Sequence, residues 1–121
     1  HALAHQPGAT HNLPHGVCNA ILLPVVEAFN RPAAVTRFAR IAQAMGVETR
    51  GMSDEQASHA AIDALRALSV RVGIPAGFRA LGIGEQDIDG WLDNALADPC
   101  APCNPLAASR EQVRGLYLQA L

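Results

Sequence analysis

The hydrophobic positions of this 121-residue chain recur at the three- and four-residue spacing of amphipathic helices. Half of the residues are hydrophobic, yet only three Phe, one Trp and one Tyr are aromatic, so a core must be built from Ala, Leu, Val and Ile. Alanine and leucine are strong helix formers. The pattern therefore predicts one all-α, helical bundle-like domain over residues 1–121, with helices near 1–6, 16–29, 31–45, 53–72, 85–97 and 109–120.

Local signals define several helix ends. Ser53 and Ser109 are each followed three positions later by Gln, which is the pattern of a capping box. Glycines 46 and 73 are expected to end the helices before them. Pro24 lies inside helix 16–29, where it predicts either a kink or two shorter helices, and Gly90 weakens helix 85–97.

Charge and cysteine usage narrow the class of protein. The formal net charge is −2, and all nine basic residues are scattered arginines, so a nucleic-acid partner is not expected. No apolar run reaches the roughly 18 residues that a membrane span needs. Three cysteines argue against a disulfide framework, and we expect a cytoplasmic protein. The pair Cys100 and Cys103 lies between prolines without a second such pair, so we expect neither zinc nor redox chemistry there.

The candidate chemistry is concentrated at the start of the chain. Four of the five histidines occur in the first sixteen residues, at His1, His5, His11 and His15. The first two share a helix face, and a helix-opening Pro-His-Gly elbow carries the last one. Neutral imidazole is a common ligand of zinc and iron.

Spacing alone leaves two interpretations of these histidines open. They can converge on a metal ion, but histidines on exposed loops are also frequent. A metal site normally needs three or four ligands, and no carboxylate occurs before Glu27. Pro7 and Gly8 are expected to end the first helix, which would leave His11 in a loop.

Two sequence motifs favour the interpretation that these histidines form a metal site. Residues 1–24, HALAHQPGATHNLPHGVCNAILLP, contain H-x-x-x-H-x-x-G followed by P-H-G-x-x-N-A-x-x-L-P, and residues 98–105, DPCAPCNP, contain D-x-C-x-x-x-N-P. Both motifs resemble those of the iron-containing (group III) alcohol dehydrogenases. The chain departs from the family pattern at Cys18, where alanine is usual, and lacks an arginine after Pro105.

The resemblance implies roles for individual residues. The family holds a divalent metal, Fe²⁺ or Zn²⁺, with one Asp and three His, and the last two ligands fall on His1 and His15. His5 would lie beside the metal, near substrate and nicotinamide, as the candidate catalytic and cofactor-binding residue. Cys100 would line the substrate end of the pocket. His11 matches no family role, and we expect it to be a solvated loop residue.

The resemblance also implies what the rest of the protein contains. The chain would be the C-terminal domain of the dehydroquinate synthase-like fold. It would lack the D-x-x-x-H helix upstream, which supplies the other two metal ligands, and the N-terminal α/β domain that binds NAD or NADP. The whole enzyme would interconvert a small alcohol and its aldehyde, as a homo-oligomer, and the chain alone would be inactive. One alternative is a free-standing helical binding or interaction module with a vestigial metal site. A second is the dehydroquinate synthase branch, against which the P-H-G-x-x-N-A-x-x-L-P motif argues.

Overall fold

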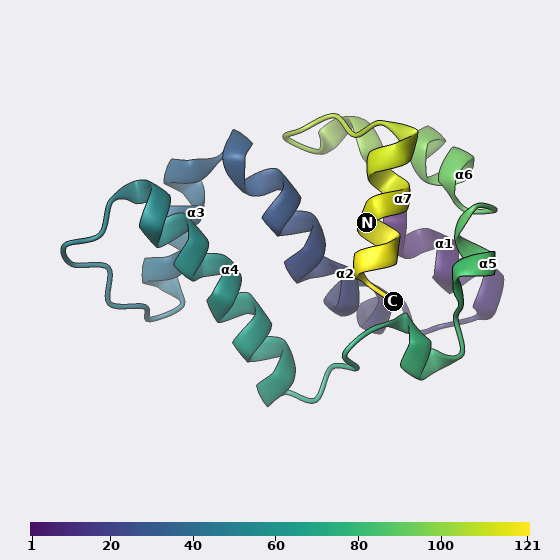
Figure 1. The fold of residues 1–121 in the computed structure, drawn as a ribbon, viewed down its shortest axis with the longest axis horizontal. Coiled ribbons are helices and arrows are strands. Elements are labelled where there is room, and N and C mark those ends of the chain that lie inside the picture. The colour runs from purple at the N-terminus through teal and green to yellow at the C-terminus, as the bar shows by residue number, and fades with distance from the viewer.

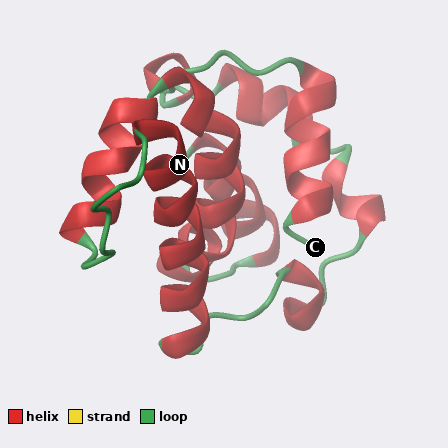
Figure 2. Cartoon of the chain, turned by 60° about the vertical axis from the view of Figure 1, so that its left-hand side comes forward, coloured by secondary structure: helices red, strands yellow, loops and turns green.

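The computed structural model describes all 121 residues and contains helices and loops but no strand (Figures 1 and 2). The all-α architecture expected from the sequence is thus confirmed. The α-helices are α1 (Ala2–His11), α2 (His15–Asn30), α3 (Val35–Ala44), α4 (Asp54–Arg71), α5 (Glu85–Ile88), α6 (Leu92–Ala97) and α7 (Arg110–Gln119). Single 3-10 turns follow α2, precede α5 and follow α6, at Arg31–Ala33, Phe78–Leu81 and Ala101–Cys103.

The main hydrophobic core lies among α1, α2, α5, α6 and α7. Of these, α1, α5, α6 and α7 gather on one side of the molecule, and α2 lies between them and α4 (Figure 1). Its largest members are fully or almost fully buried aromatic and branched side chains. They are Phe78, Ile83, Ile88, Trp91, Leu92, Val113 and Tyr117. This core fixes the start of α1 against α7 and therefore positions the histidine-rich end of the chain.

A second, smaller core lies between α3 and α4, which pack side by side on the opposite side of the molecule (Figure 1). It buries Phe38, Ala42, Ala61 and Ile62. Two apolar residues here are nevertheless exposed: Ile41 of α3 at 38%, and Val72, which follows α4, at 61%.

Both predicted capping boxes are present. Ser53 Oγ accepts a hydrogen bond from the Gln56 backbone N–H at 3.1 Å, and Gln56 Oε1 accepts one from the Ser53 N–H at 2.9 Å. The Ser109 and Gln112 pair makes the same reciprocal bonds at the start of α7. Helix α4 ends before Gly73, whose φ of 78° is the left-handed conformation that glycine favours.

The prediction that Pro7 and Gly8 end the first helix is wrong. Helix α1 continues through Pro7 to His11 and ends at Asn12, which has a left-handed φ of 52°. A proline in a helix cannot donate to the carbonyl four residues back, which here is Leu3. The Tyr117 hydroxyl donates to the Leu3 carbonyl at 2.7 Å instead. A tertiary contact therefore satisfies the acceptor that proline leaves free.

Helix α2 is continuous through Pro24, so of the two expectations for this segment the alternative of two shorter helices does not hold. Two other helix predictions need correction. The segment 31–45 opens with a 3-10 turn, and α3 begins only at Val35. The segment 85–97 is interrupted between Ile88 and Leu92, where Gly90 lies, so it forms the two short helices α5 and α6. No helix has both the length and the hydropathy required to cross a bilayer.

Candidate metal centre

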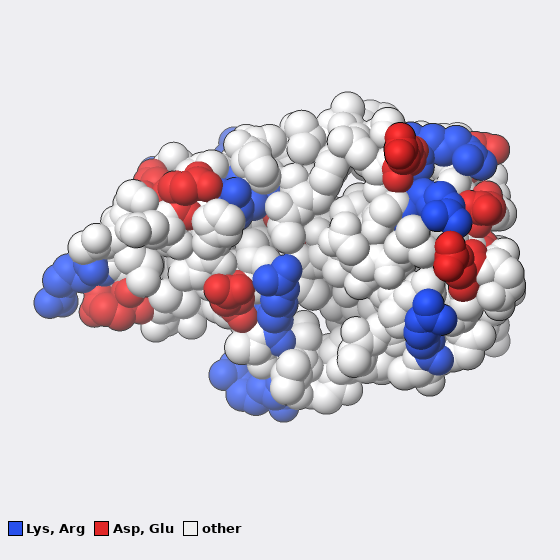
Figure 3. All heavy atoms as spheres, in the orientation of Figure 1, with Lys and Arg blue, Asp and Glu red and all other residues white.

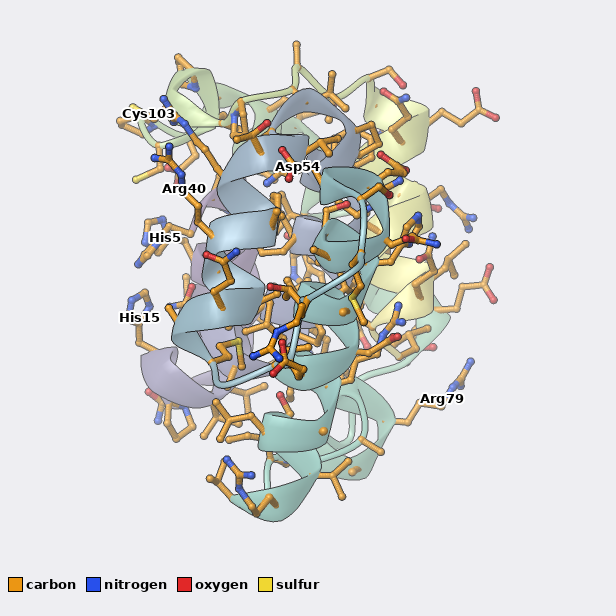
Figure 4. All side chains as sticks on the ribbon, turned by 90° about the vertical axis from the view of Figure 1, so that its left-hand side faces the viewer. His5, His15, Arg40, Asp54, Arg79 and Cys103 are labelled. Carbon is orange, nitrogen blue, oxygen red and sulfur yellow. The ribbon has the colours of Figure 1, made fainter.

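Three histidine rings from the start of α1 and the start of α2 come together. The first turn of α1 places His1 and His5 on one face, and the His5 backbone N–H donates to the His1 carbonyl at 3.0 Å. Pro14, with a φ of −58°, turns the chain so that His15 is the first residue of α2. Ring centroids are 5.5 Å apart for His1 and His15, 5.5 Å for His5 and His15, and 6.0 Å for His1 and His5. Figure 4 shows His5 and His15 pointing from the same side of the molecule.

This donor set fits a divalent transition metal. Imidazole nitrogens bind such ions at about 2 Å, so two rings that share a tetrahedral ion have centroids roughly 5 Å apart. The separation of 5.5 Å between His1 and His15 is close to that value. Both residues are exposed on the surface of this chain, where ligands from another domain can complete a coordination shell. The ring spacing alone does not separate His5 from the other two.

His15 has a neighbour that affects its availability. The Asn19 side-chain amide donates to His15 Nε2 at 2.9 Å and to the His15 carbonyl at 3.2 Å. A ring nitrogen has one lone pair, so Nε2 cannot accept from Asn19 and bind a metal at the same time. Metal binding through Nε2 therefore requires the Asn19 side chain to turn away.

His5 is held by an acidic partner from a distant part of the chain. Its Nδ1 lies 2.8 Å from Oδ2 of Asp98, the residue that follows α6. The Cys100 backbone N–H donates to the other carboxylate oxygen, Oδ1, at 2.8 Å. The hydrogen bond from His5 and then that from the Cys100 backbone lower the pKa of the Asp98 carboxyl, so Asp98 is ionised at neutral pH.

Cys100 lies beside this pair and on the wall of the main cavity. The ligand atoms of His5, Asp98 and Cys100 lie within 4.8 Å of one another. The cavity, of about 840 Å³, is lined by His1, His15 and Cys100 together with a largely apolar set of residues from α1, α2, α6 and α7. His5 does not line it. Three of the four site residues expected from the sequence thus share one cavity, and the fourth, His5, lies beside it with its ring stacked on that of His15 at 5.5 Å.

The charge around the cavity is low. Its lining includes no arginine, and Glu27 is its one charged side chain. A second cavity, of about 450 Å³, lies beside it and also contains His1, Glu27 and Cys100. On the face shown in Figure 3, charged side chains lie over the two ends of the molecule and over α4, while the surface between α2 and α7 is uncharged. Such a pocket suits a small neutral ligand.

The other histidine and cysteine residues have structural surroundings. His11 is not in a loop, as the sequence suggested, but is the last residue of α1. It packs edge-on against Trp91 with ring centroids 5.7 Å apart, and its Nε2 lies 3.5 Å from Asp87. Cys18 is fully buried, and this burial raises the pKa of its thiol. Cys103 is exposed and unpaired.

Comparison with known proteins identifies the class. The sequence matches the family described as "Fe-containing alcohol dehydrogenase family, C-terminal" over residues 1–121. Lactaldehyde reductase of Escherichia coli (strain K12) is 44% identical over 117 residues, which are 97% of this chain and 31% of that protein. NAD-dependent methanol dehydrogenase of Bacillus methanolicus is 37% identical over all of this chain and 32% of its own length.

Solved structures agree with the sequence matches. The crystal structure of a 1,3-propanediol oxidoreductase superposes with a TM-score of 0.98 at 40% identity, covering 100% of this chain and 32% of that one. An alcohol dehydrogenase from Oenococcus oeni gives a TM-score of 0.95 at 40% identity. The chain belongs to the Fe-containing alcohol dehydrogenase family and corresponds to its C-terminal domain. It spans about a third of the length of these relatives, 31% for the lactaldehyde reductase, and the alternative of an unrelated helical module is not favoured.

The sequence did not single out two residues of the site. Asp98 opens the D-x-C-x-x-x-N-P motif, but that motif directed attention to Cys100 only. Asn19 lies one helical turn after His15, a spacing that predicts contact between the two side chains. A search for polar residues at this spacing from each histidine would have found Asn19. Asp98 is 93 positions from His5, and only the packing of α1 against α6 brings them together.

Proposed function

We propose that this chain is the metal- and substrate-binding domain of an NAD(P)-dependent alcohol dehydrogenase that interconverts a small alcohol and its aldehyde. The observation that carries the proposal is the pairing of His1, at the start of α1, with His15, at the start of α2, within a chain that matches the family along its whole length. Further ligands from elsewhere in the whole enzyme must complete the site, because two imidazoles do not fill the coordination shell of a catalytic metal.

In this proposal His1 and His15 would hold Fe²⁺ or Zn²⁺, together with an Asp and a third His from an upstream D-x-x-x-H helix of the whole enzyme. Both metals accept imidazole nitrogen, and iron is the metal that the family name specifies. When bound, the ion would supply Lewis acidity to the substrate oxygen and so favour loss of the hydroxyl proton. Asn19 turns away from His15 when the metal binds and is then free to face the pocket.

His5 is the proposed catalytic and cofactor-contacting residue. It stacks on His15 at a centroid distance of 5.5 Å, so it lies beside the proposed metal position. Imidazole can take up and release a proton near neutral pH, which suits either relay of the hydroxyl proton or alignment of the substrate next to the nicotinamide of NAD or NADP. Its fixed partner, Asp98, keeps the ring at this place.

The cavity indicates the substrate class. Cys100 lines it near His1 and His15, at the proposed substrate end, and most of the remaining lining is apolar. Because no arginine lines the cavity, a carboxylate or phosphate on the substrate would have no cationic partner from this domain. We therefore propose a short neutral alcohol or diol, which agrees with the activities named for the lactaldehyde reductase and 1,3-propanediol dehydrogenase relatives. We further propose that the whole enzyme is a cytoplasmic homo-oligomer.

The direct test is an assay of the full-length protein that contains this chain. The protein is stripped of metal, reloaded with Fe²⁺ or Zn²⁺ separately, and supplied with NAD⁺ or NADP⁺ and a series of short alcohols, diols and hydroxy acids. We expect metal-dependent reduction of one nicotinamide cofactor, with neutral alcohols preferred to hydroxy acids. Absence of any metal-dependent turnover across the series would refute the proposal. A preference for hydroxy acids would refute the substrate class alone.

A further inference from the structure

Both carboxylate oxygens of Asp98 are committed to specific donors. Oδ2 lies 2.8 Å from His5 Nδ1, and Oδ1 accepts from the Cys100 N–H, also at 2.8 Å. The Asp98 side chain is 11% exposed, whereas that of His5 is 37% exposed. Asp98 is therefore largely shielded from solvent, while the His5 ring that it contacts remains partly exposed.

This arrangement determines where the neutral His5 ring carries its proton. An ionised carboxylate can only accept hydrogen bonds, so the nitrogen that faces it must be protonated. His5 Nδ1 is therefore an N–H group. No protein group bonds to the other ring nitrogen, Nε2, which then carries a lone pair.

We propose that Asp98 is a positioning residue that locks His5 in the Nδ1–H tautomer and thereby leaves Nε2 as a hydrogen-bond acceptor for the substrate hydroxyl. This inference rests on the proposed function and assigns a role to a residue outside the metal-binding histidine motif. In the oxidation direction the hydroxyl proton passes to Nε2, while the electron pair of the substrate C–H bond leaves as hydride for NAD(P)⁺. The alcohol is oxidised, the nicotinamide is reduced, and the proton is later released to water.

The Asp98→Asn variant replaces a carboxylate oxygen, which accepts hydrogen bonds, with an NH₂ group, which donates them, and hardly changes the shape of the side chain. If the Asn oxygen stays on the Cys100 N–H, the Asn NH₂ group faces His5 Nδ1 as a donor. The Cys100 backbone N–H can only donate, so the Asn oxygen stays opposite it. A neutral imidazole can move its proton from one ring nitrogen to the other, so His5 accepts at Nδ1 and adopts the Nε2–H tautomer. An Asp-to-Asn change beside a catalytic histidine lowers kcat by about 10⁴ where the wrong tautomer results. We expect a loss between about 10²- and 10⁴-fold here.

The Asp98→Ala variant provides the contrast. It removes the hydrogen bond between His5 Nδ1 and Asp98 without favouring the Nε2–H tautomer. His5 can therefore still have an unprotonated Nε2 for part of the time. We expect kcat to fall by only about tenfold. Asp98→Ala nevertheless destabilises the loop more than Asp98→Asn does, because the Cys100 N–H loses its acceptor. A purely structural role of Asp98 predicts the opposite order, with Ala worse than Asn. Asp93→Asn, on the surface at the start of α6 with an 83% exposed side chain, is the matched control.

The experiment compares these three variants with the wild type as full-length proteins. Two readouts are kcat, with KM for alcohol and cofactor, and the metal content by elemental analysis. The third is the tautomer of His5, read from ¹⁵N shifts and couplings in metal-free protein labelled at histidine, with His5→Gln used to assign the signals. We expect an Nδ1–H signal in the wild type, Nε2–H in Asp98→Asn, unchanged metal content, and a loss of kcat larger for Asn than for Ala.

Two results would overturn the inference: an Nε2–H tautomer in the wild type, or a kcat for Asp98→Asn equal to or above that of Asp98→Ala. If the wild type oxidises no alcohol, the proposed function has failed. The tautomer measurement needs no turnover, so it still decides whether Asp98 locks His5.

Discussion

The Tyr117 hydroxyl donates a hydrogen bond of 2.7 Å to the carbonyl of Leu3, which is 114 positions away in the sequence. That carbonyl is the acceptor that Pro7 cannot serve, because proline has no N–H. The contact explains why α1 continues through a proline, and it ties the last helix to the turn that carries His1 and His5. Tyr117 is itself fully buried and packs against Trp91 with ring centroids 5.1 Å apart.

We expect Tyr117→Phe to lower the free energy of unfolding by about 1–3 kcal/mol, because it leaves the carbonyl of the half-buried Leu3 without this donor. Urea unfolding followed by the fluorescence of Trp91, the single tryptophan, measures this cost. In a Pro7→Ala background the new backbone N–H can serve the same carbonyl. The Tyr117→Phe cost should then be smaller, and the four proteins form a double-mutant cycle. Equal costs in both backgrounds would show that Tyr117 does not compensate for Pro7.

Because the hydroxyl of Tyr117 is buried, we also expect the protein to lose stability at alkaline pH. Burial, and then the nearby charge of Asp98 and that of Cys18, raise the pKa of its hydroxyl above the ordinary value. In the unfolded chain the same group ionises at about pH 10. The folded state therefore disfavours the phenolate, so this stabilising term is complete below about pH 10 and is lost as the pH rises further, toward the folded-state pKa.

The measurement is the unfolding midpoint in urea between pH 8 and pH 11 for wild type and Tyr117→Phe. We expect the wild type to lose stability faster than the variant above about pH 10, so that the two curves converge. If the two curves stay parallel across this range, the folded state does not raise the pKa of the Tyr117 hydroxyl, and the account of Tyr117 is contradicted.

A reciprocal amide pair holds the loop that carries Cys100. Asn30 Nδ2 donates to Asn104 Oδ1 at 2.9 Å, and Asn104 Nδ2 donates to Asn30 Oδ1 at 2.7 Å. Asn30 is only 2% exposed, so Asn104→Ala leaves buried polar atoms unsatisfied and should cost about 1–3 kcal/mol. Asn94→Ala, at an exposed position of α6, is the control and should change stability by less than about 0.5 kcal/mol.

Amide hydrogen exchange tests whether that cost is local. We expect the segment 98–108 to exchange faster in Asn104→Ala while α3 and α4 stay unchanged, because their core is separate from this loop. Uniform acceleration across the chain would mean that the amide pair stabilises the whole fold and not this loop in particular.

Features encoded by neighbouring residues could be predicted from the sequence. The capping boxes at Ser53 and Ser109 depend on side chains three positions apart, and both formed as expected. The buried positions of Leu92, Val113 and Tyr117 agree with the helical spacing of hydrophobic residues in α6 and α7. The histidine motif likewise indicated the family, because its residues are contiguous in the chain.

Features that depend on tertiary contacts could not be predicted in this way. The continuation of α1 through Pro7 needs a donor from Tyr117, and the orientation of His5 needs Asp98. Propensity favoured one helix over residues 85–97, but the chain turns between Ile88 and Leu92. There the Asp89 carboxylate accepts from Arg114 Nε on α7 at 2.9 Å. In each case a contact between residues far apart in the sequence accompanies the local conformation.

The central claim is that His1 and His15 hold the metal, and the most direct test is the metal content of the full-length protein carrying His15→Ala. The control is His11→Ala, because His11 belongs to the same histidine-rich stretch of sequence but faces Trp91 and Asp87. Elemental analysis after purification and dialysis should give about one metal per chain in the wild type and in His11→Ala, and almost none in His15→Ala. Undiminished metal in His15→Ala, with the protein folded as judged by circular dichroism, would contradict the account.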